Sequence, residues 1–238
     1  MKTSTARTLL RLNRRFYDTF ASEFSDSRST LQPGIVEALN HLRPFDSLLD
    51  VGCGDGRVGR TVQDSIQRYV GVDYSANLLA QSNQPTGQPT NLAFLIADLS
   101  SSNWVREVTA RFDAAVCFST LHHIPGARRR RRVLREIRSL LRPHGRCAVS
   151  VWQFLHVPRL RRKIVSWIEI GLSDDEVDAG DYLLDWQRGG RGLRYVHHFD
   201  EAELIALCER AGFNVIDTYR SDGHASGSGD MGLYVILQ

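Results

Sequence analysis

One sequence feature constrains the fold of this chain most. It is an apolar run that includes an acidic residue and is followed by alternating glycines. Residues 48–56 read LLDVGCGDG, and a second apolar run at residues 69–72 ends at Asp73. Glycines at a strand-to-helix turn let the backbone approach a ligand closely. An acid at the end of the following strand is placed to bind a ribose diol. The pattern therefore predicts a parallel α/β sheet with an adenosine-containing ligand.

The charges beside these glycines distinguish two kinds of ligand. Residues 54–59 also match the GxGxxG pattern of dinucleotide sites, in which a pyrophosphate lies at the turn. Asp50 and Asp55 flank the turn in this chain and would repel a pyrophosphate. S-adenosylmethionine (SAM) carries a sulfonium and an ammonium instead, and two carboxylates suit these positive charges. We therefore expect SAM as the cofactor, with Asp50 among its binding residues.

The rest of the chain repeats the alternation of strand and helix. Apolar runs of strand length alternate with helical patterns, which predicts an α/β fold with a doubly wound, mostly parallel sheet. The ligand of such a sheet lies outside the carboxyl ends of its strands. Seven strands are expected, at residues 47–51, 69–73, 92–97, 112–118, 146–152, 213–219 and 233–237.

Further segments surround this predicted sheet. Residues 9–25 and 33–41 read as helices, so residues 1–45 are expected to be an N-terminal helical region. Residues 158–170 are expected to form a basic helix, and residues 173–192 read mostly as a loop. An irregular segment longer than about 15 residues in a compact domain is usually a lid or a binding loop. We therefore expect a single domain over residues 1–238, with a lid or substrate insertion at residues 155–198.

Composition agrees with one globular domain. The chain has 238 residues, of which 42% are hydrophobic and 24% charged, values that are ordinary for a folded protein with a sizeable core. The sequence has no run of about 18 apolar residues, so no membrane contact is expected. The N-terminus lacks the apolar core of a secretory signal, and the four cysteines show no CxxC spacing. We expect buried free thiols in a cytoplasmic protein, and no metal site.

Five consecutive arginines, Arg128–Arg132, stand out against a net charge of only +3. Val133, Leu134 and Ile137 follow at helical spacing, so the run is expected to open an amphipathic helix. Such a cluster could contact phosphates. It could equally be the solvated face of a helix, and the sequence leaves both interpretations open.

From residue 47 to residue 153 the chain resembles the class I SAM-dependent methyltransferases. The third predicted strand ends at Asp98, and the fourth leads into the segment STLHHI at residues 119–124, as in that family. The resemblance implies that the glycine turn holds the methionine part of SAM and that the acid after the second strand binds the ribose. The acid after the third strand would face the adenine amino group. Carried over, these residues are Gly52, Gly54, Gly56, Asp73 and Asp98, with Leu99 beside the adenine.

Three further stretches resemble the tRNA wobble-uridine methyltransferases, which esterify the carboxymethyl group on uridine C5. They are residues 16–28, residues 181–186 (DYLLDW) and residues 194–204 (RYVHHFDEAEL). The resemblance implies tRNA as the substrate and a small zinc-binding activator protein as a partner. The chain departs from the family at Ile124 and Asp185, where tryptophan and proline are usual, and in the closing segment from Asp222 to His224.

The chemistry of this acceptor indicates which residue types should act on it. A carboxylate with a pKa near 4 is already ionised at pH 7, so it needs a planar cationic clamp more than a base. Arg28 and Arg194 lie in the family-like stretches and are the candidates. His122 could orient the substrate or act as the base for a hydroxyl acceptor, and the resemblance favours His197 over His198. A small-molecule carboxylate or hydroxyl acceptor, and a SAM-binding protein without turnover, remain alternatives.

Overall fold

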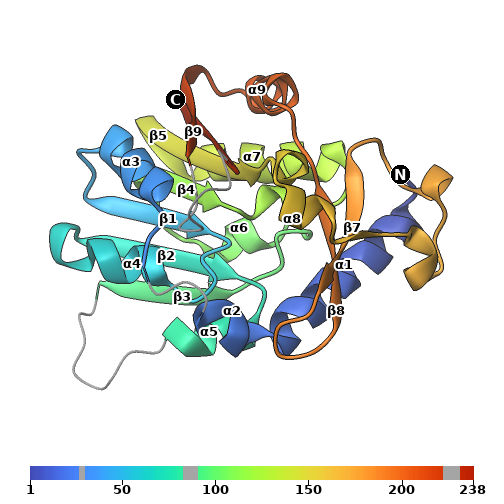
Figure 1. The fold of residues 1–238 in the computed structure, drawn as a ribbon. Coiled ribbons are helices and arrows are strands. Elements are labelled where there is room, and N and C mark those ends of the chain that lie inside the picture. The colour runs from blue at the N-terminus through green and yellow to red at the C-terminus, as the bar shows by residue number, and fades with distance from the viewer. Residues whose placement is uncertain (27–29, 83–90, 222–230) are drawn as a thin grey trace.

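The computed structural model describes residues 1–26, 30–82, 91–221 and 231–238, and its centre is a seven-stranded sheet (Figure 1). The strand order is β3-β2-β1-β4-β5-β10-β9. The first five strands in this order pair in parallel, and β10 pairs antiparallel with both β5 and β9. The predicted mostly parallel, seven-stranded α/β sheet is thereby confirmed. The strands are β1 (Ser47–Val51), β2 (Arg68–Asp73), β3 (Leu92–Ile96), β4 (Phe112–Phe118), β5 (Leu141–Trp152), β9 (Val215–Ser221) and β10 (Gly232–Leu237).

Helices cover both faces of this sheet, which explains why its central strands are apolar throughout. All five residues of β1 are buried, because its alternate side chains enter two different clusters. Burying both faces is the normal condition of a parallel sheet. On one face lie α3 (Pro33–Leu42), α4 (Arg57–Val62) and α5 (Ala76–Ser82), and on the other α6 (Trp104–Glu107), α7 (Ala127–Leu140) and α9 (Glu201–Arg210).

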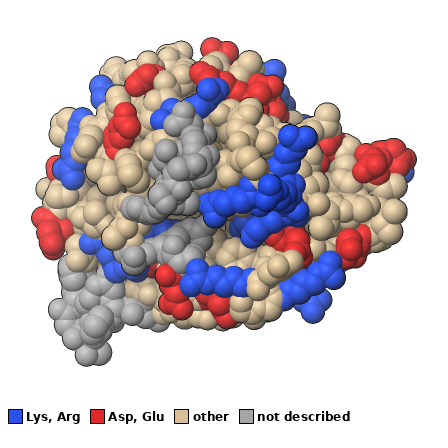
Figure 2. Space-filling view, viewed as in Figure 1, with Lys and Arg blue, Asp and Glu red and all other residues tan. Residues whose placement is uncertain are grey.

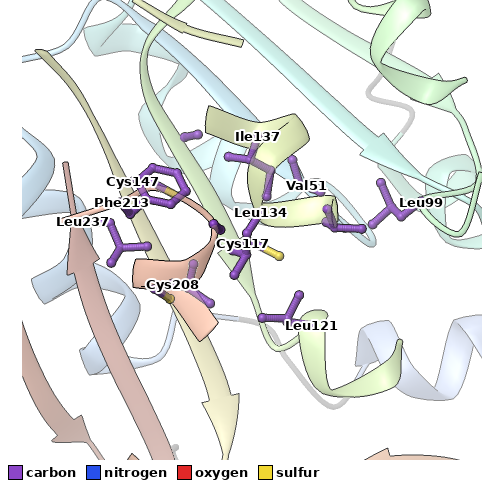
Figure 3. Close-up of a cluster of buried hydrophobic side chains, with 14 of the residues drawn as sticks. Val51, Leu99, Cys117, Leu121, Leu134, Ile137, Cys147, Cys208, Phe213 and Leu237 are labelled. Carbon is purple, nitrogen blue, oxygen red and sulfur yellow. The ribbon is translucent and has the colours of Figure 1, made fainter. Parts of the chain in front are cut away.

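The larger cluster contains three of the four cysteines. Figure 3 shows Cys117, Cys147 and Cys208 among apolar side chains from α7, α9 and the sheet. All four cysteines of the chain are free and buried, as the sequence predicts. Burial raises the pKa of the Cys117 thiol, so it stays protonated and packs as a small apolar group.

The first expected helix, over residues 9–25, is divided into two helices in the structure. Helix α1 (Thr3–Thr19) begins earlier than predicted, and α2 (Ala21–Asp26) follows a break at Phe20. The buried aromatic stripe continues through the break, from Phe16 and Tyr17 to Phe20. This stripe places α1 against α5 and β8 (Gly192–His197), close to the carboxyl ends of the sheet strands.

The segment expected to hold a basic helix and a loop forms a second, three-stranded sheet. Helix α8 ends after one turn (Pro158–Arg161), and β6 (Ile164–Val165), β7 (Asp181–Trp186) and β8 pair antiparallel. The expectation of one helix over residues 158–170 was wrong, and the expectation that residues 173–192 are mostly loop missed strand β7. Both faces of β7 are covered, because Leu183 packs beside Leu9 and Leu184 packs beside Phe154. A strand buried on both faces lacks the alternation that identifies strands in a sequence.

Among the described residues, no helix combines the length and the apolar run that crossing a bilayer requires.

Candidate active site

A cavity opens where β1, β2 and β4 end at their carboxyl edge. Its floor is formed by residues that directly follow these strands, and its far wall by the N-terminal helices. This is the edge at which open parallel sheets bind ligands. Its lining includes Asp50, Gly52, Gly54, Asp73 and Thr120 from the strand ends, and Tyr17, Tyr74, Leu99, His123 and Trp152 around them.

The glycine turn after β1 has the left-handed backbone that the sequence pattern predicts. The φ angles of Gly52, Gly54 and Gly56 are 79°, 57° and 73°. A Cβ on Gly52 would lie 2.0 Å from the Thr120 hydroxyl oxygen, so no side chain fits there. A Cβ on Gly54 would meet no atom within 4 Å and would project into open space instead. Gly54 therefore keeps the cavity clear for a ligand.

The carboxylate of Asp73 holds this turn in place. One oxygen accepts a hydrogen bond from the Gly54 N–H at 2.9 Å, and the other accepts from the Ser75 N–H at 2.9 Å. Burial raises the pKa of Asp73, although these backbone donors favour the ionised form. Asp73 thus orders the glycine turn and also lines the cavity, where a ribose would lie.

Asp50 is a buried acid in the floor of the cavity. The Tyr69 O–H donates to its carboxylate at 2.7 Å, a contact between neighbouring strands that the sequence did not reveal. Burial raises the pKa of Asp50 to about 7, despite this hydrogen bond. A cationic ligand group in the cavity would favour the ionised form, so the site is suited to a bound ammonium.

Asp98 and Leu99, both predicted to lie near the adenine, differ in their position relative to the cavity. Leu99 is buried and lines the cavity, in agreement with a place beside an adenine ring. Asp98 is half-buried, lies outside that lining and accepts a hydrogen bond from the Ser100 N–H at 2.8 Å. Its predicted contact with the adenine amino group stays a prediction.

The opposite wall of the cavity is built from Tyr17 and His123. The Tyr17 hydroxyl lies 2.7 Å from His123 Nε2, and His123 Nδ1 lies 3.0 Å from the Tyr195 carbonyl oxygen. A carbonyl can only accept, so Nδ1 carries the proton and Nε2 accepts from the Tyr17 O–H. The tautomer of His123 is therefore fixed, and α1 is tied to the loop after β4.

His122, a predicted catalytic residue, is fully buried beside this wall. Neither ring nitrogen has a hydrogen-bond partner within the part of the chain that the structure describes. Its ring packs 4.8 Å from the Trp152 ring and 4.3 Å from the His123 ring, measured between centroids. Burial lowers the pKa of His122 well below its usual value, so the imidazole is neutral and can both donate and accept.

Arg194, the other described candidate for acceptor binding, is a cation in an aromatic cage. Its guanidinium carbon lies 4.7 Å from the Trp152 ring centroid, 5.3 Å from that of Phe16 and 5.4 Å from that of Trp186. The side chain is 4% exposed, and its Nε and Nη1 have no hydrogen-bond partner among the described residues. Burial lowers the pKa of Arg194, and the nearby Tyr17 hydroxyl partly offsets this.

Comparisons with known proteins agree with this geometry. A family model described as a methyltransferase domain matches residues 49–147, which contain the glycine turn, Asp73 and the paired histidines. The chain contains a methyltransferase domain and has the fold of SAM-dependent methyltransferases, which together support a SAM-dependent methyltransferase. SAM is its cofactor, and the cavity residues described above fit it: two buried carboxylates and an open glycine turn match a ligand with two positive charges.

Several curated relatives are similar to this methyltransferase over most of its length. A methyltransferase of Encephalitozoon cuniculi is 28% identical over 204 residues, which is 85% of this chain and 87% of that protein. The tRNA (carboxymethyluridine(34)-5-O)-methyltransferase of Schizosaccharomyces pombe is 26% identical over 84% of this chain and 88% of its own. The mouse enzyme of that name, ALKBH8, is 31% identical over 57% of this chain but only 19% of its own length.

Solved structures agree with the fold. The complex of DhpI with SAM superposes with a TM-score of 0.67 at 20% identity, covering 97% of each chain. A methyltransferase of Haloferax volcanii, solved with its Trm112 activator, gives a TM-score of 0.65 at 15% identity, covering 94% of this chain and 96% of that one. The class I methyltransferase sheet is therefore shared across widely diverged sequences.

The remaining predicted site residues lie apart from the cavity or outside the described residues. Arg28 belongs to the latter group, as does the closing segment from Asp222 to His224. His197 is buried, and its ring nitrogens lie 2.7 Å from Asp181 Oδ1 and 2.9 Å from Glu203 Oε1. Hydrogen bonds to these acids raise the pKa of His197, although burial opposes them. The structure therefore places His197 in an ion-pair network and not in the cavity lining.

The arginine run opens α7 as expected, but its members have different surroundings. Arg130 is 1% exposed, donates to the Ile124 carbonyl oxygen at 3.2 Å and lies 3.7 Å from Glu203. Arg132 donates to the Leu99 carbonyl oxygen at 3.0 Å and pairs with Glu136. Two of the five arginines are thus engaged within the protein, and the run is not one continuous basic surface.

Sequence reasoning missed several residues of the site. Tyr17 and Trp152 had no assigned role, and Trp186 was noted only as part of a resemblance. Tyr17 lies in a family-like stretch and Trp152 ends a predicted strand, so both positions carried a signal. No sequence pattern indicates that three aromatic rings from distant segments would surround Arg194.

Proposed function

We propose that this methyltransferase esterifies the carboxymethyl group of a modified wobble uridine in tRNA. The observation that carries the proposal is the Arg194 guanidinium, which is buried next to the cavity and has two nitrogens without a hydrogen-bond partner among the described residues. A buried charge without a hydrogen-bonding partner is costly, so such a group indicates a ligand that completes it. A guanidinium presents parallel N–H donors that match a carboxylate in two places at once.

The residues around Arg194 suit this acceptor chemically. SAM, when bound, supplies an electrophilic methyl group on a sulfonium. An ionised carboxylate oxygen can form the new bond to that carbon while the carbon–sulfur bond breaks and its electron pair stays on sulfur. Arg194 would orient the carboxylate, and the rings of Trp152 and Trp186 would exclude water from it. His122 is neutral at pH 7, so it can hydrogen-bond the acceptor without competing for its negative charge.

The names of the relatives support the same substrate. Those of the Schizosaccharomyces pombe and mouse proteins specify the carboxymethyl group of uridine 34 in tRNA. The Schizosaccharomyces pombe protein matches over 84% of this chain, which includes the small sheet that contributes Arg194 and Trp186. This chain spans only 19% of the mouse protein, so that similarity concerns one part of the mouse protein.

The direct test is methyl transfer to defined tRNA. Purified enzyme and isotopically labelled SAM are incubated with tRNA carrying carboxymethyluridine at the wobble position, and the nucleosides are analysed by mass spectrometry. We expect a labelled methyl ester of that nucleoside, and none when the wobble base is unmodified uridine. Labelling of a small carboxylic acid from a metabolite extract, with no labelling of either tRNA, would instead establish the small-molecule alternative.

We also propose that a small zinc-binding protein assists this enzyme. The support is the fold neighbour from Haloferax volcanii, whose structure contains the Trm112 methyltransferase activator. The test adds the Trm112-type protein of the same organism to the methyl-transfer assay. A rise in rate at saturating SAM and tRNA is expected, and an unchanged rate together with failure to co-elute in gel filtration would exclude this partner.

A further inference from the structure

Four of the five residues from 159 to 163 are basic, and they lie in α8 and just beyond it. Arg159, Arg161 and Arg162 are exposed, and Lys163 is half-buried. None of the four forms an ion pair with a residue in the described ranges. This distinguishes them from Arg191 on the neighbouring hairpin, which pairs with both Glu169 and Asp185.

Gathering these charges has an electrostatic cost that the protein does not neutralise. Burial lowers the pKa of Lys163, and the positive charges of Arg194 and Arg159 lower it further, while Asp185 opposes them only in part. Like charges held together on one surface repel each other and create a positive potential above it. A partner with negative charge would relieve this repulsion.

The basic surface is continuous with the proposed acceptor site. The Lys163 ammonium lies 5.8 Å from the Trp186 ring centroid, and the same ring lies 5.4 Å from the Arg194 guanidinium carbon. The Lys163 carbonyl oxygen also accepts from the Asp185 N–H at 2.8 Å, which ties α8 to β7. Figure 2 shows basic side chains gathered over the region that α8 occupies in Figure 1.

We propose that Arg159, Arg161, Arg162 and Lys163, here called the α8 basic surface, bind the phosphates of the RNA chain next to the nucleotide being methylated. This inference rests on the proposed function, because it assumes an RNA substrate whose base enters beside Arg194. Arginine forks match phosphate oxygens, and the partly exposed Trp186 ring offers a neighbouring surface on which a base can stack. A single-turn helix has no extended apolar face to insert into a bilayer, which favours RNA over a lipid surface.

The test compares two triple variants that remove the same charge. Arg159→Gln/Arg161→Gln/Arg162→Gln alters the α8 basic surface, and Arg128→Gln/Arg129→Gln/Arg131→Gln alters the members of the arginine run that form no ion pair among the described residues. The dissociation constant for an anticodon stem-loop RNA is measured against salt concentration. We expect the slope of log K against log salt to fall in magnitude by about 2 for the first variant, at roughly 0.7–0.9 per phosphate contact.

The second triple variant is expected to keep the wild-type slope, and both variants are expected to bind SAM normally. Equal loss in both variants would mean a general charge effect, and an unchanged slope in the first would place the RNA elsewhere; either result overturns the inference. If the first variant bound anionic vesicles more weakly than wild type but bound RNA equally well, the surface would bind membranes, and this result would also overturn the inference. Because binding is measured on unmodified RNA, an enzyme that fails to methylate carboxymethyluridine would refute the proposed function without deciding this one.

Discussion

Replacing Arg194 with methionine should lower activity and leave stability nearly unchanged. Moving a cation into a protein interior costs several kcal/mol, and each aromatic contact returns about 0.5–2 kcal/mol. Three rings surround the guanidinium, and two of its nitrogens lack a hydrogen-bond partner within the described ranges, so the cost of burial and the aromatic contacts nearly cancel. Methionine fills much of the same space without a charge, so we expect Arg194→Met to change the free energy of unfolding by less than about 1 kcal/mol, or to increase it.

The effect on catalysis should be large because, in the proposed clamp, the two guanidinium nitrogens without a partner among the described residues bind the acceptor carboxylate. Two charge-assisted hydrogen bonds to a carboxylate contribute about 1.5–3 kcal/mol each. At 1.36 kcal/mol per tenfold change, their loss lowers kcat/KM by about 10² to 10⁴. The assay is methyl transfer to tRNA carrying carboxymethyluridine, with SAM affinity measured separately by calorimetry. SAM affinity should stay within threefold of the wild-type value.

Arg130→Met provides the matched control. Arg130 is equally buried, but both of its terminal nitrogens have partners, and it lies 3.7 Å from Glu203 and 3.3 Å from His197 Nε2. Removing one member of such a buried network costs about 3–5 kcal/mol, so this variant should lose stability. If Arg194→Met lost as much stability as Arg130→Met, or kept kcat/KM within threefold of wild type, Arg194 would be a structural residue and the clamp would be refuted.

Three further predictions follow from the cofactor site and the acceptor chemistry. Asp73→Ala should weaken SAM binding by about 1.5–3 kcal/mol. It should also lower thermal stability, because it leaves the Gly54 and Ser75 N–H groups without their acceptor. A calorimetric SAM affinity equal to that of the wild type would exclude the ribose contact. Because Asp50 has a pKa of about 7, raised from 3.8, the folded apoenzyme holds an extra proton between these values. Its stability should therefore fall as pH rises from about 4 to 7, SAM affinity should rise between pH 6 and 7.5, and Asp50→Asn should remove both trends. Arg194→Lys should reduce kcat more than His122→Ala does, and the wild-type enzyme should remain active at pH 6, because an ionised acceptor needs orientation and no base. A larger effect of His122→Ala, together with a wild-type rate that collapses below about pH 6.5, would indicate a hydroxyl or amine acceptor.

The cofactor half of the site could be predicted from the sequence because it is encoded locally. The turn from Gly52 to Gly56 and the acid Asp73 each directly follow an apolar strand, and parallel pairing of those strands brings them together. Their chemical types alone then indicate a cationic nucleoside ligand. The Tyr69 partner of Asp50 could not be predicted, since it depends on the register between β1 and β2.

The acceptor half depends on contacts between segments that are far apart in the chain. The rings around Arg194 come from α1, β5 and β7, and only the small sheet places them together. That sheet was misread as a helix and a loop because Leu183 and Leu184 are both buried, on opposite faces of β7. The family resemblance singled out Arg194, but it could not show that its Nε and Nη1 lack hydrogen-bond partners among the described residues.

The predicted acceptor-site residues differ in how completely they are hydrogen-bonded. His197 differs in this respect from His122 and Arg194, although the sequence offered no reason to distinguish them. His197 contacts Asp181, Glu203 and Arg130, so its ring nitrogens are committed within the protein, and it connects β8 to α7 and α9. His122 and Arg194 are as deeply buried. Among the residues that the structure describes, however, neither ring nitrogen of His122 and only one of the three guanidinium nitrogens of Arg194 has a hydrogen-bond partner or solvent contact. Native proteins rarely leave buried polar groups without partners, except where a ligand or water supplies them. The first network therefore joins the small sheet to the methyltransferase core, whereas His122 and Arg194 are the buried groups to which we propose that the substrate binds.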